Sequence, residues 1–235
     1  MNIENKSQSG SVLVYILIAV ALFAALSYTV AGMMRGGSGE SSGKEKAGIY
    51  ASEIMSYARS MREAVQIMRV SNECDDSQIS FANNIVSGYS HSPVSSASCR
   101  LFDVNGGGLS YQKPDISVNG GLDWIFTGAN DGYNIGTQCN SASCADLIAI
   151  LPEISLEICK AINKKHDIAV SNGDITQEND YFDVTKFVGS YSFGARFSDD
   201  TGLQELKGKY QGCVEGNSAP QSSGKYYFYQ VLIAR

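Results

Sequence analysis

Six cysteines are the residues of this chain whose chemistry is easiest to predict. An even number of cysteines after one long hydrophobic segment is typical of disulfides formed in an oxidising compartment. The alternatives are reduced core cysteines and a zinc site. Zinc is disfavoured because the chain has no C-x-x-C pair, and neither His91 nor His166 lies at ligand spacing from a cysteine pair. All six follow the hydrophobic segment: Cys74, Cys99, Cys139, Cys144, Cys159 and Cys213.

The pairing of these cysteines is open, because six cysteines allow fifteen connectivities. Short loops cost the least entropy to close, which favours the bridges Cys139–Cys144 and Cys74–Cys99. Those two bridges leave Cys159 to pair with Cys213.

The remaining reactive side chains do not form a set with the spacing of an active site. His91 lies in a serine-rich stretch, and His166 follows lysines at the end of an expected helix. The paired acids Asp75-Asp76 and Asp199-Asp200 provide oxygen ligands for calcium, but both lack the spaced Asp-x-Asp-x-Asp-Gly pattern, so solvated turns are the preferred interpretation. Gly106-Gly107-Gly108 lacks the Lys-Ser/Thr of a phosphate-binding loop. We therefore expect no enzyme, no metal and no cofactor.

Composition limits the class of protein. The chain has 235 residues, of which 43% are hydrophobic and 18% charged, and its net charge is −6. One domain with its own core is therefore expected, together with an anchor. A chain without a basic surplus is a poor partner for nucleic acid.

The hydrophobic segment runs from Ser11 to Met34 without a charged residue. As a helix it is roughly 36 Å long at about 1.5 Å per residue, enough to span a hydrocarbon core of about 30 Å with some tilt. Apolar residues cover every face, which disfavours a core helix. Three interpretations compete: a cleaved secretory signal ending near Ala31-Gly32, an ordinary signal anchor, and a prepilin-type leader followed by a retained helix.

The third interpretation depends on a family resemblance. Lys6-Ser7-Gln8-Ser9-Gly10, followed at once by Ser11-Val12-Leu13-Val14-Tyr15, resembles the N-terminus of a type IV pilin or of a type II secretion pseudopilin. The resemblance implies that Gly10 is the last leader residue. A prepilin peptidase would cleave after it, and the new N-terminal residue Ser11 would be N-methylated. The apolar helix would stay on the mature protein.

Two positions depart from the family pattern. Ser11 stands where the family usually has Phe or Met, and Tyr15 stands where most members have Glu. The second departure implies a minor or tip subunit rather than a major one. The resemblance thus implies a minor pilin or pseudopilin whose partners are other subunits, the peptidase and inner-membrane lipid. The alternative is a signal-anchored binding or adhesin-like domain, outside the cytoplasm, that does not polymerise.

The distribution of basic residues favours the opposite orientation. Arg35, Lys44 and Lys46 follow the hydrophobic segment, whereas only Lys6 precedes it. We give more weight to the six cysteines, which a reducing cytoplasm would not explain. The expected location is the bacterial inner membrane with a single pass, and the head lies in the periplasm or on a surface filament.

The segment after the anchor divides into a joint and a second helix. Residues 35–48 are rich in Gly and Ser, which predicts a flexible joint. Residues 47–70 predict an amphipathic helix packed on a sheet, because apolar residues recur at three- and four-residue steps. The apolar stripe consists of Tyr50, Ile54, Tyr57, Met61, Val65 and Met68.

The rest of the chain predicts an α+β head closed by an antiparallel sheet and disulfides. Trp124 is expected in the core. We expect strands over 100–104, 109–112 and 122–126 and within 182–197, a turn over 130–134, and an exposed loop over 171–180. Helices are expected over 145–151 and 155–166, separated at Pro152, and a hairpin from 208–215 and 225–234. The domains are a leader (1–10), a membrane or filament-core helix (11–34), the joint (35–48) and a pilin-like head (49–235).

Overall fold

The structure is a computed structural model, and it divides into two compact units, Met1–Glu45 and Lys46–Arg235. We call the second unit the head. The described residues are 9–35, 38–139, 141–168, 175, 177–178, 182–197, 206–216, 221–222 and 224–235, with backbone only for 9–11, 31–35, 38–41 and 177–178. The predicted leader up to residue 8, the acid pair Asp199-Asp200 and most of 171–180 lie outside these ranges, although Ile175 is buried.

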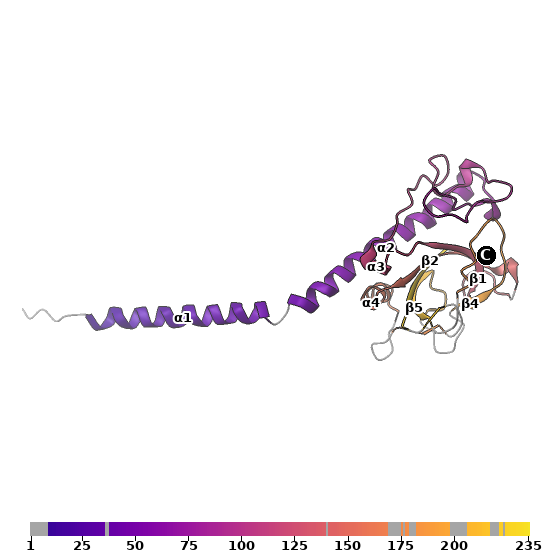
Figure 1. Ribbon diagram of the computed structural model, residues 1–235. Coiled ribbons are helices and arrows are strands. Elements are labelled where there is room, and N and C mark those ends of the chain that lie inside the picture. The colour runs from indigo at the N-terminus through magenta and orange to yellow at the C-terminus, as the bar shows by residue number, and fades with distance from the viewer. Residues whose placement is uncertain are drawn as a thin grey trace, which may run out of the picture. The chain divides into compact units, whose positions relative to one another are not determined.

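The apolar helix α1 extends over Ser9–Arg35 and confirms the helix predicted for the hydrophobic segment. Helix α2 follows over Ser38–Ser71 (Figure 1). Residues from 38 onward are helical, so the Gly and Ser residues of the predicted joint over 35–48 do not prevent a helix there. Once the buried part of a helix has formed, extending it needs no new nucleation step. Each added residue then costs only the free energy given by its helix propensity, which is about 1 kcal/mol for Gly.

Helix α2 buries one face in the head, as its periodicity predicts. Ile54, Met61, Val65 and Met68 are at most 7% exposed, and Tyr50 is half-buried against them. The alanines at 47, 51, 58 and 64 are also buried and let the helix approach the sheet closely. The apolar stripe is therefore core.

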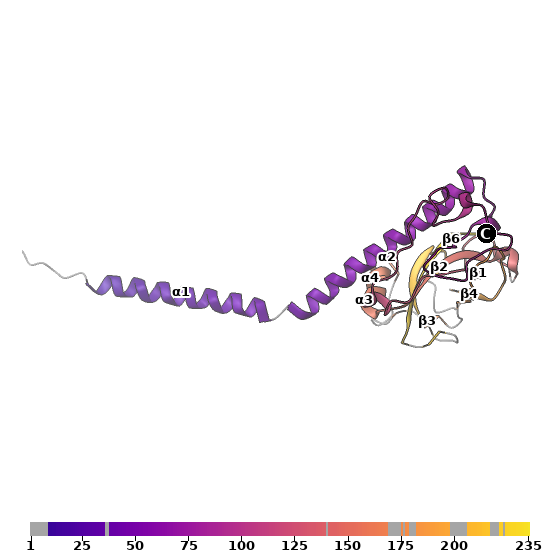
Figure 2. The ribbon, with the colours of Figure 1, turned by 45° about the horizontal axis from the view of Figure 1, so that its top comes forward.

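The sheet is mixed, with strand order β3-β5-β6-β2-β1-β4 in the described residues (Figure 2). Strands β1, β2, β6 and β5 pair antiparallel, whereas the edge strands β4 and β3 pair parallel to β1 and β5. The expectation of a purely antiparallel sheet is therefore wrong at both edges. The strands are β1 (Ile125–Gly132), β2 (Asp146–Ile154), β3 (Gln177–Glu178), β4 (Ala195–Phe197), β5 (Gln211–Gly216) and β6 (Tyr226–Ile233).

Strand β2 corrects the prediction of a helix over 145–151. Leu147, Ala149 and Leu151 join the core on the α2 face of the sheet, whereas Ile148 and Ile150 join the core on the other face. A strand buried on both faces is a continuous apolar run, and periodicity alone does not separate it from a buried helix. Pro152 lies at an irregularity of pairing between Leu151 and Ile154, where a missing N–H is tolerated.

The other sheet predictions had mixed outcomes. The hairpin over 208–215 and 225–234 is confirmed as β5 and β6. The strand predicted at 122–126 begins only at Ile125 and continues to Gly132, so the turn predicted over 130–134 is confirmed only at 133–134. The strand expected in 182–197 is limited to β4.

Helix α4 (Leu156–Lys165) confirms the second predicted helix, including its cap. The Ser155 hydroxyl accepts a hydrogen bond from the Ile158 N–H at 3.4 Å. Ile158, Cys159 and Ile162 bury their side chains in the same core as α2. On the other face, a second core contains Ile135, Ile168, Phe182, Phe197, Leu206 and Tyr229.

Residues 72–124 form an irregular layer with the short helices η1 (Asp76–Gln78), η2 (Ala97–Cys99) and α3 (Ile116–Asn119). The hairpin predicted from 100–104 and 109–112 is absent from this layer. Residues 100–108 instead fold into consecutive turns, in which the Gly107 N–H donates to the Arg100 carbonyl at 3.0 Å. A Cβ on Gly106 would collide with the same Arg100 carbonyl, so the glycines allow a turn too tight for a hairpin.

Tyrosine hydroxyls attach this layer to the sheet and to α2. Tyr89 accepts from the Phe126 N–H and Tyr111 accepts from the Trp124 N–H, each at 3.1 Å. Tyr57 of α2 accepts from the Gln112 N–H at 3.0 Å. Trp124 is 3% exposed and packs against the Tyr57 ring, which confirms it as a core residue.

Candidate functional site

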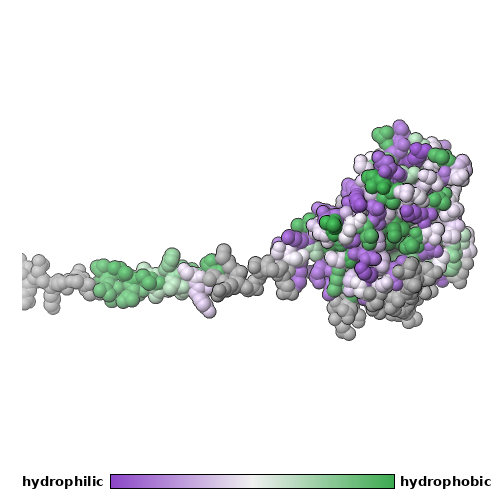
Figure 3. All heavy atoms as spheres, viewed as in Figure 1, coloured by the Kyte–Doolittle hydropathy of each residue, from purple (hydrophilic) through white to green (hydrophobic). Residues whose placement is uncertain are grey.

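Helix α1 is the first candidate, because it exposes apolar side chains on all sides. Its residues Val12–Val30 have a mean hydropathy of 2.4, and they form the one helix in the described residues that is long and apolar enough to cross a membrane. The large apolar side chains of this stretch are 51–82% exposed, and its visible surface in Figure 3 is largely hydrophobic. Such a surface is stable in lipid or against other apolar helices.

The few polar side chains of α1 satisfy their hydrogen bonds inside the helix. The Ser27 hydroxyl donates to the Phe23 carbonyl and the Thr29 hydroxyl to the Leu26 carbonyl, each at 2.8 Å. Tyr15 and Tyr28 are exposed. The Ser27 and Thr29 hydroxyls therefore remain paired without water, which suits a hydrocarbon environment. Gly10 and Ser11 lie in the first turn of α1.

All six cysteines form disulfides in the head, with no free cysteine in the described residues. The pairs are Cys74–Cys99, Cys139–Cys144 and Cys159–Cys213, which are the pairs that loop closure favoured. Cys74–Cys99 links two parts of the irregular layer, and Cys139–Cys144 closes the loop before β2. Cys159–Cys213 joins α4 to β5. The disulfides thus connect segments that share few backbone hydrogen bonds.

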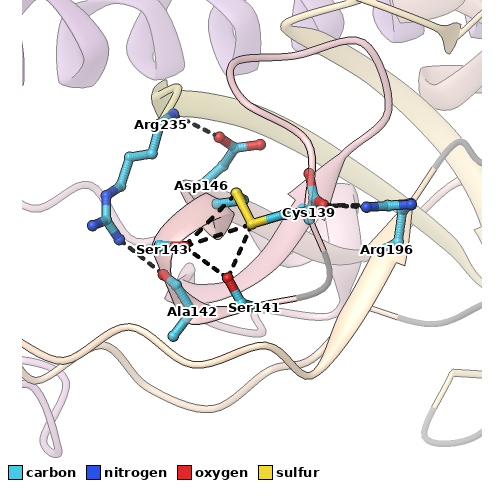
Figure 4. Close-up of a disulfide and its surroundings, with 9 residues drawn as sticks. Cys139, Ser141, Ala142, Ser143, Asp146, Arg196 and Arg235 are labelled. Atoms are coloured by element: carbon cyan, nitrogen blue, oxygen red, sulfur yellow. Dashed lines mark hydrogen bonds and ion pairs between the residues drawn. A yellow bond between two sulfur atoms is a disulfide. The ribbon is translucent and has the colours of Figure 1, made fainter.

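A buried charged cluster surrounds the Cys139–Cys144 bridge (Figure 4). Asp146, at the start of β2, accepts hydrogen bonds from the Gly132 and Arg235 N–H groups at 2.9 Å each. Burial raises the pKa of Asp146 to about 7, opposed by these two N–H donors. Asp131 of β1 is fully buried and pairs with Arg196 of β4 at 2.6 Å. These groups join the ends of β1, β2, β4 and β6.

Asp76 lies in a second charged cluster, at an open cleft of about 600 Å³. It pairs with Arg69 of α2 at 2.7 Å and, more distantly, with Arg235 at 3.7 Å. The Arg235 guanidinium stacks 3.8 Å from the centre of the Tyr191 ring. A carboxylate that already faces two guanidinium groups is a poor cation ligand, and no group of metal-ligating side chains occurs in the described residues.

The two histidines occupy separate places and both are more buried than their sequence context suggested. His91 is 8% exposed and His166 is half-buried. Burial lowers the pKa of both imidazoles. Neither ring is hydrogen-bonded to a hydroxyl, thiol or carboxylate in the part of the chain that the structure describes, so the described geometry contains no nucleophile–base pair.

Sequence reasoning missed the buried cluster of Asp131, Asp146, Arg196 and Arg235. Asp131 was read as part of a turn because it lies between Asn130 and Gly132. The one available signal was the position of Asp146, directly before the apolar run of β2, where a charged residue needs a partner when it is buried.

Comparison with protein-family models, with curated proteins and with solved structures gives no match for this chain.

Proposed function

We propose that the chain is a minor pilin or pseudopilin subunit that assembles into a type IV pilus or a secretion pseudopilus. The observation that carries the proposal is α1, an apolar helix without a charge from Val12 to Val30, whose side chains are exposed on every face. Its first turn contains the Gly10-Ser11 junction, whose sequence resembles a prepilin cleavage site. A helix of this kind serves first as a membrane anchor and then as packing surface for the same helix of other subunits.

The assembly step replaces lipid contacts by contacts between helices. Without a hydrophobic gain from leaving lipid, such association depends on van der Waals packing and on interhelical hydrogen bonds. Tyr15 supplies a hydroxyl but no charge at the position where most family members have Glu. A buried carboxylate needs a partner charge in hydrocarbon, so a subunit without it does not require that pairing and suits a minor or tip position.

The architecture of the head supports the proposal. An amphipathic helix directly follows the apolar helix in sequence, and its apolar stripe packs on an antiparallel core of four strands. The three disulfides favour a head outside the cytoplasm. The location that follows is the bacterial inner membrane, with the head in the periplasm or on a surface filament.

Mass spectrometry of the mature N-terminus tests the proposal. The protein should be purified from host membranes, with a Gly10→Leu variant as the matched control for cleavage. A mature chain that begins at N-methylated Ser11, and an uncleaved Gly10→Leu chain, are the expected results. An intact Met1 would leave a signal-anchored binding domain, and a start near Gly32 would leave a secreted domain. Either outcome overturns the proposal.

A further inference from the structure

The three disulfides of the head differ in how far they are open to an attacking thiol. Cys139 is half-buried, whereas the cysteines of the other two bridges are at most 5% exposed. The bridge Cys139–Cys144 also closes the shortest loop, with a sequence separation of 5. Thiol–disulfide exchange requires access to one sulfur of the bridge. A dissolved thiol therefore reaches this bridge most easily, through Cys139.

Two serine hydroxyls lie beside the Cys139 sulfur (Figure 4). Oγ of Ser141 is 2.9 Å from Sγ of Cys139, and Oγ of Ser143 is 3.5 Å from the same sulfur. A disulfide sulfur carries no hydrogen, so the hydroxyl is the donor in each contact. Such a donor stabilises a thiolate more than a neutral sulfur, because a hydrogen bond to the charged form favours that form. The surroundings of the bridge thus favour the release of Cys139 as a thiolate.

The loop that this bridge closes binds the guanidinium of Arg235 (Figure 4). Nη1 of Arg235 donates a hydrogen bond to the Ala142 carbonyl at 3.1 Å. The backbone of Arg235 is held separately, because its N–H donates to Asp146 at 2.9 Å. A movement of the loop is therefore expected to act on the guanidinium rather than on the end of the sheet.

The same guanidinium reaches the segment that follows α2. Nε of Arg235 is 3.7 Å from Oδ2 of Asp76, and Oδ1 of Asp76 pairs with Nε of Arg69 on α2 at 2.7 Å. The ring of Tyr191 supports the guanidinium from one face, 3.8 Å from the ring centre. Asp76 is the first residue of η1 and lines the open cleft of about 600 Å³. One side chain thus connects the disulfide loop with the charged cluster at the end of α2.

We propose that Cys139–Cys144 is a redox switch, which a dithiol opens while the other two bridges stay closed, and that Arg235 transmits its state to Asp76. In the first step a thiolate of the dithiol attacks Sγ of Cys139, the S–S bond breaks, and Cys144 leaves as a thiolate that takes up a proton. In the second step the other thiolate of the dithiol attacks the mixed disulfide. Cys139 then leaves as a thiolate and takes up a proton in turn. The chain gains two electrons and two protons, and the dithiol becomes a disulfide.

The opened bridge has a specific consequence for the cleft. Without the covalent closure of the loop, the Ala142 carbonyl no longer holds the guanidinium of Arg235, and the contact between Arg235 and Asp76 weakens. The reduced head should therefore keep its fold but have a less stable η1 segment. The switch is independent of filament assembly, because every residue that forms it belongs to the head.

Hydrogen exchange in defined redox buffers tests both parts of the proposal. Full-length protein in detergent micelles is equilibrated with mixtures of reduced and oxidised dithiothreitol. One sample is alkylated for peptide mass spectrometry, and a parallel sample is exchanged into D₂O. Some mixtures should give alkylated Cys139 and Cys144 while the other cysteines stay unmodified. In these mixtures peptides that cover Asp76–Gln78 should exchange about fivefold faster than in the oxidised protein, as for the loss of one hydrogen bond.

Three variants test the route through Arg235. The double variant Cys139→Ser/Cys144→Ser should show the faster exchange without any reductant. Arg235→Gln keeps the N–H that Asp146 accepts but removes the guanidinium, so reduction should no longer change the exchange over 76–78. Lys225→Gln removes a cation that pairs with Glu153 at 2.6 Å outside this cluster, and it should respond to reduction like the wild type.

Four results would overturn the proposal. The three bridges open together, or Cys139–Cys144 opens only where circular dichroism shows an unfolded head. Exchange over 76–78 is equal in the oxidised and reduced proteins. The last is an Arg235→Gln chain, with all three bridges intact before reduction, that keeps the full response.

Discussion

Asp146 and Arg235 are joined through the backbone, because Oδ1 of the buried carboxyl accepts the Arg235 N–H at 2.9 Å. The other oxygen accepts the Gly132 N–H, so one side chain fixes the end of β1 and the residues after β6. Burial raises the pKa of this carboxyl to about 7. Its protonation state therefore links pH to the stability of the sheet.

Asp146 should contribute less to the stability of the head as pH rises from about 4 to about 7. The folded pKa of Asp146 lies above the unfolded value of about 3.9, so the folded state binds the proton more tightly. The resulting stabilisation is complete below pH 4 and is lost as pH rises through 7. Thermal unfolding from pH 4 to 8 checks this, because the stability advantage of the wild type over Asp146→Asn should shrink as pH rises.

The difference between the two profiles isolates Asp146, because titration of His91 and His166 occurs in both proteins. Asp146→Asn should also cost about 1–3 kcal/mol at pH 5, since its NH₂ group cannot accept the second N–H. Glu63→Gln, on the exposed face of α2, should follow the wild-type profile. Parallel profiles for wild type and Asp146→Asn would refute this prediction.

Packing of α2 on the sheet predicts a large difference between two substitutions on the same helix. Met61 is fully buried, whereas Ile67 is 57% exposed. Met61→Ala should lower the free energy of unfolding by about 2–5 kcal/mol through the cavity that it leaves. Ile67→Ala should change it by less than about 0.5 kcal/mol. Urea titration of both variants measures the difference, and equal midpoints would contradict the packing of α2.

Asn163 provides a third test, because its side chain pairs with the backbone of one residue. Its amide donates to the Cys213 carbonyl at 2.7 Å and accepts the Cys213 N–H at 2.9 Å. Asn163→Asp replaces the donor by a buried charge and should destabilise the head by at least about 1–3 kcal/mol at pH 8. At pH 4 the protonated acid can donate again, so the loss should be smaller.

The control for this substitution is Asn84→Asp, at an exposed bend position. It should leave the urea midpoint within error of the wild type at both pH values. If Asn163→Asp is equally harmless, the Asn163–Cys213 contact does not stabilise the fold.

The three disulfides should be reduced in a fixed order. Cys139 is half-buried, whereas Cys159 and Cys213 are fully buried. Thiol–disulfide exchange requires access to a sulfur, so dithiothreitol should open Cys139–Cys144 first and Cys159–Cys213 last. Timed alkylation followed by peptide mass spectrometry gives the order. Alkylated Cys213 appearing before alkylated Cys139 would show that exposure does not control reduction.

Local patterns predicted the elements whose signals are local. The stripe of α2, the Ser155 cap of α4 and the β5–β6 hairpin depend on residues near one another in sequence, and all three are present. The apolar run of β2 was predicted as a helix. Its two buried faces arise only from its position in the sheet between β1 and β6, which the run itself does not indicate. The turns over 100–108 replaced a predicted hairpin because Gly106 and Gly107 pack against the backbone of Arg100 and Leu101, an approach that the local pattern did not indicate.

The sites were less predictable than the fold. Helix α1 is visible from composition alone, because its apolar residues follow one another without interruption in the sequence. By contrast, Asp131 pairs with Arg196 through a parallel strand pair that no local pattern indicates.

The position of β6 has a consequence for the order of events during biosynthesis. Residues 226–233 are made after every other strand of the sheet, yet they lie between β5 and β2. Until they leave the ribosome, the β3–β5 and β2–β1–β4 groups have no strand to join them. The described sheet therefore stays in two separate parts until its last strand has been made.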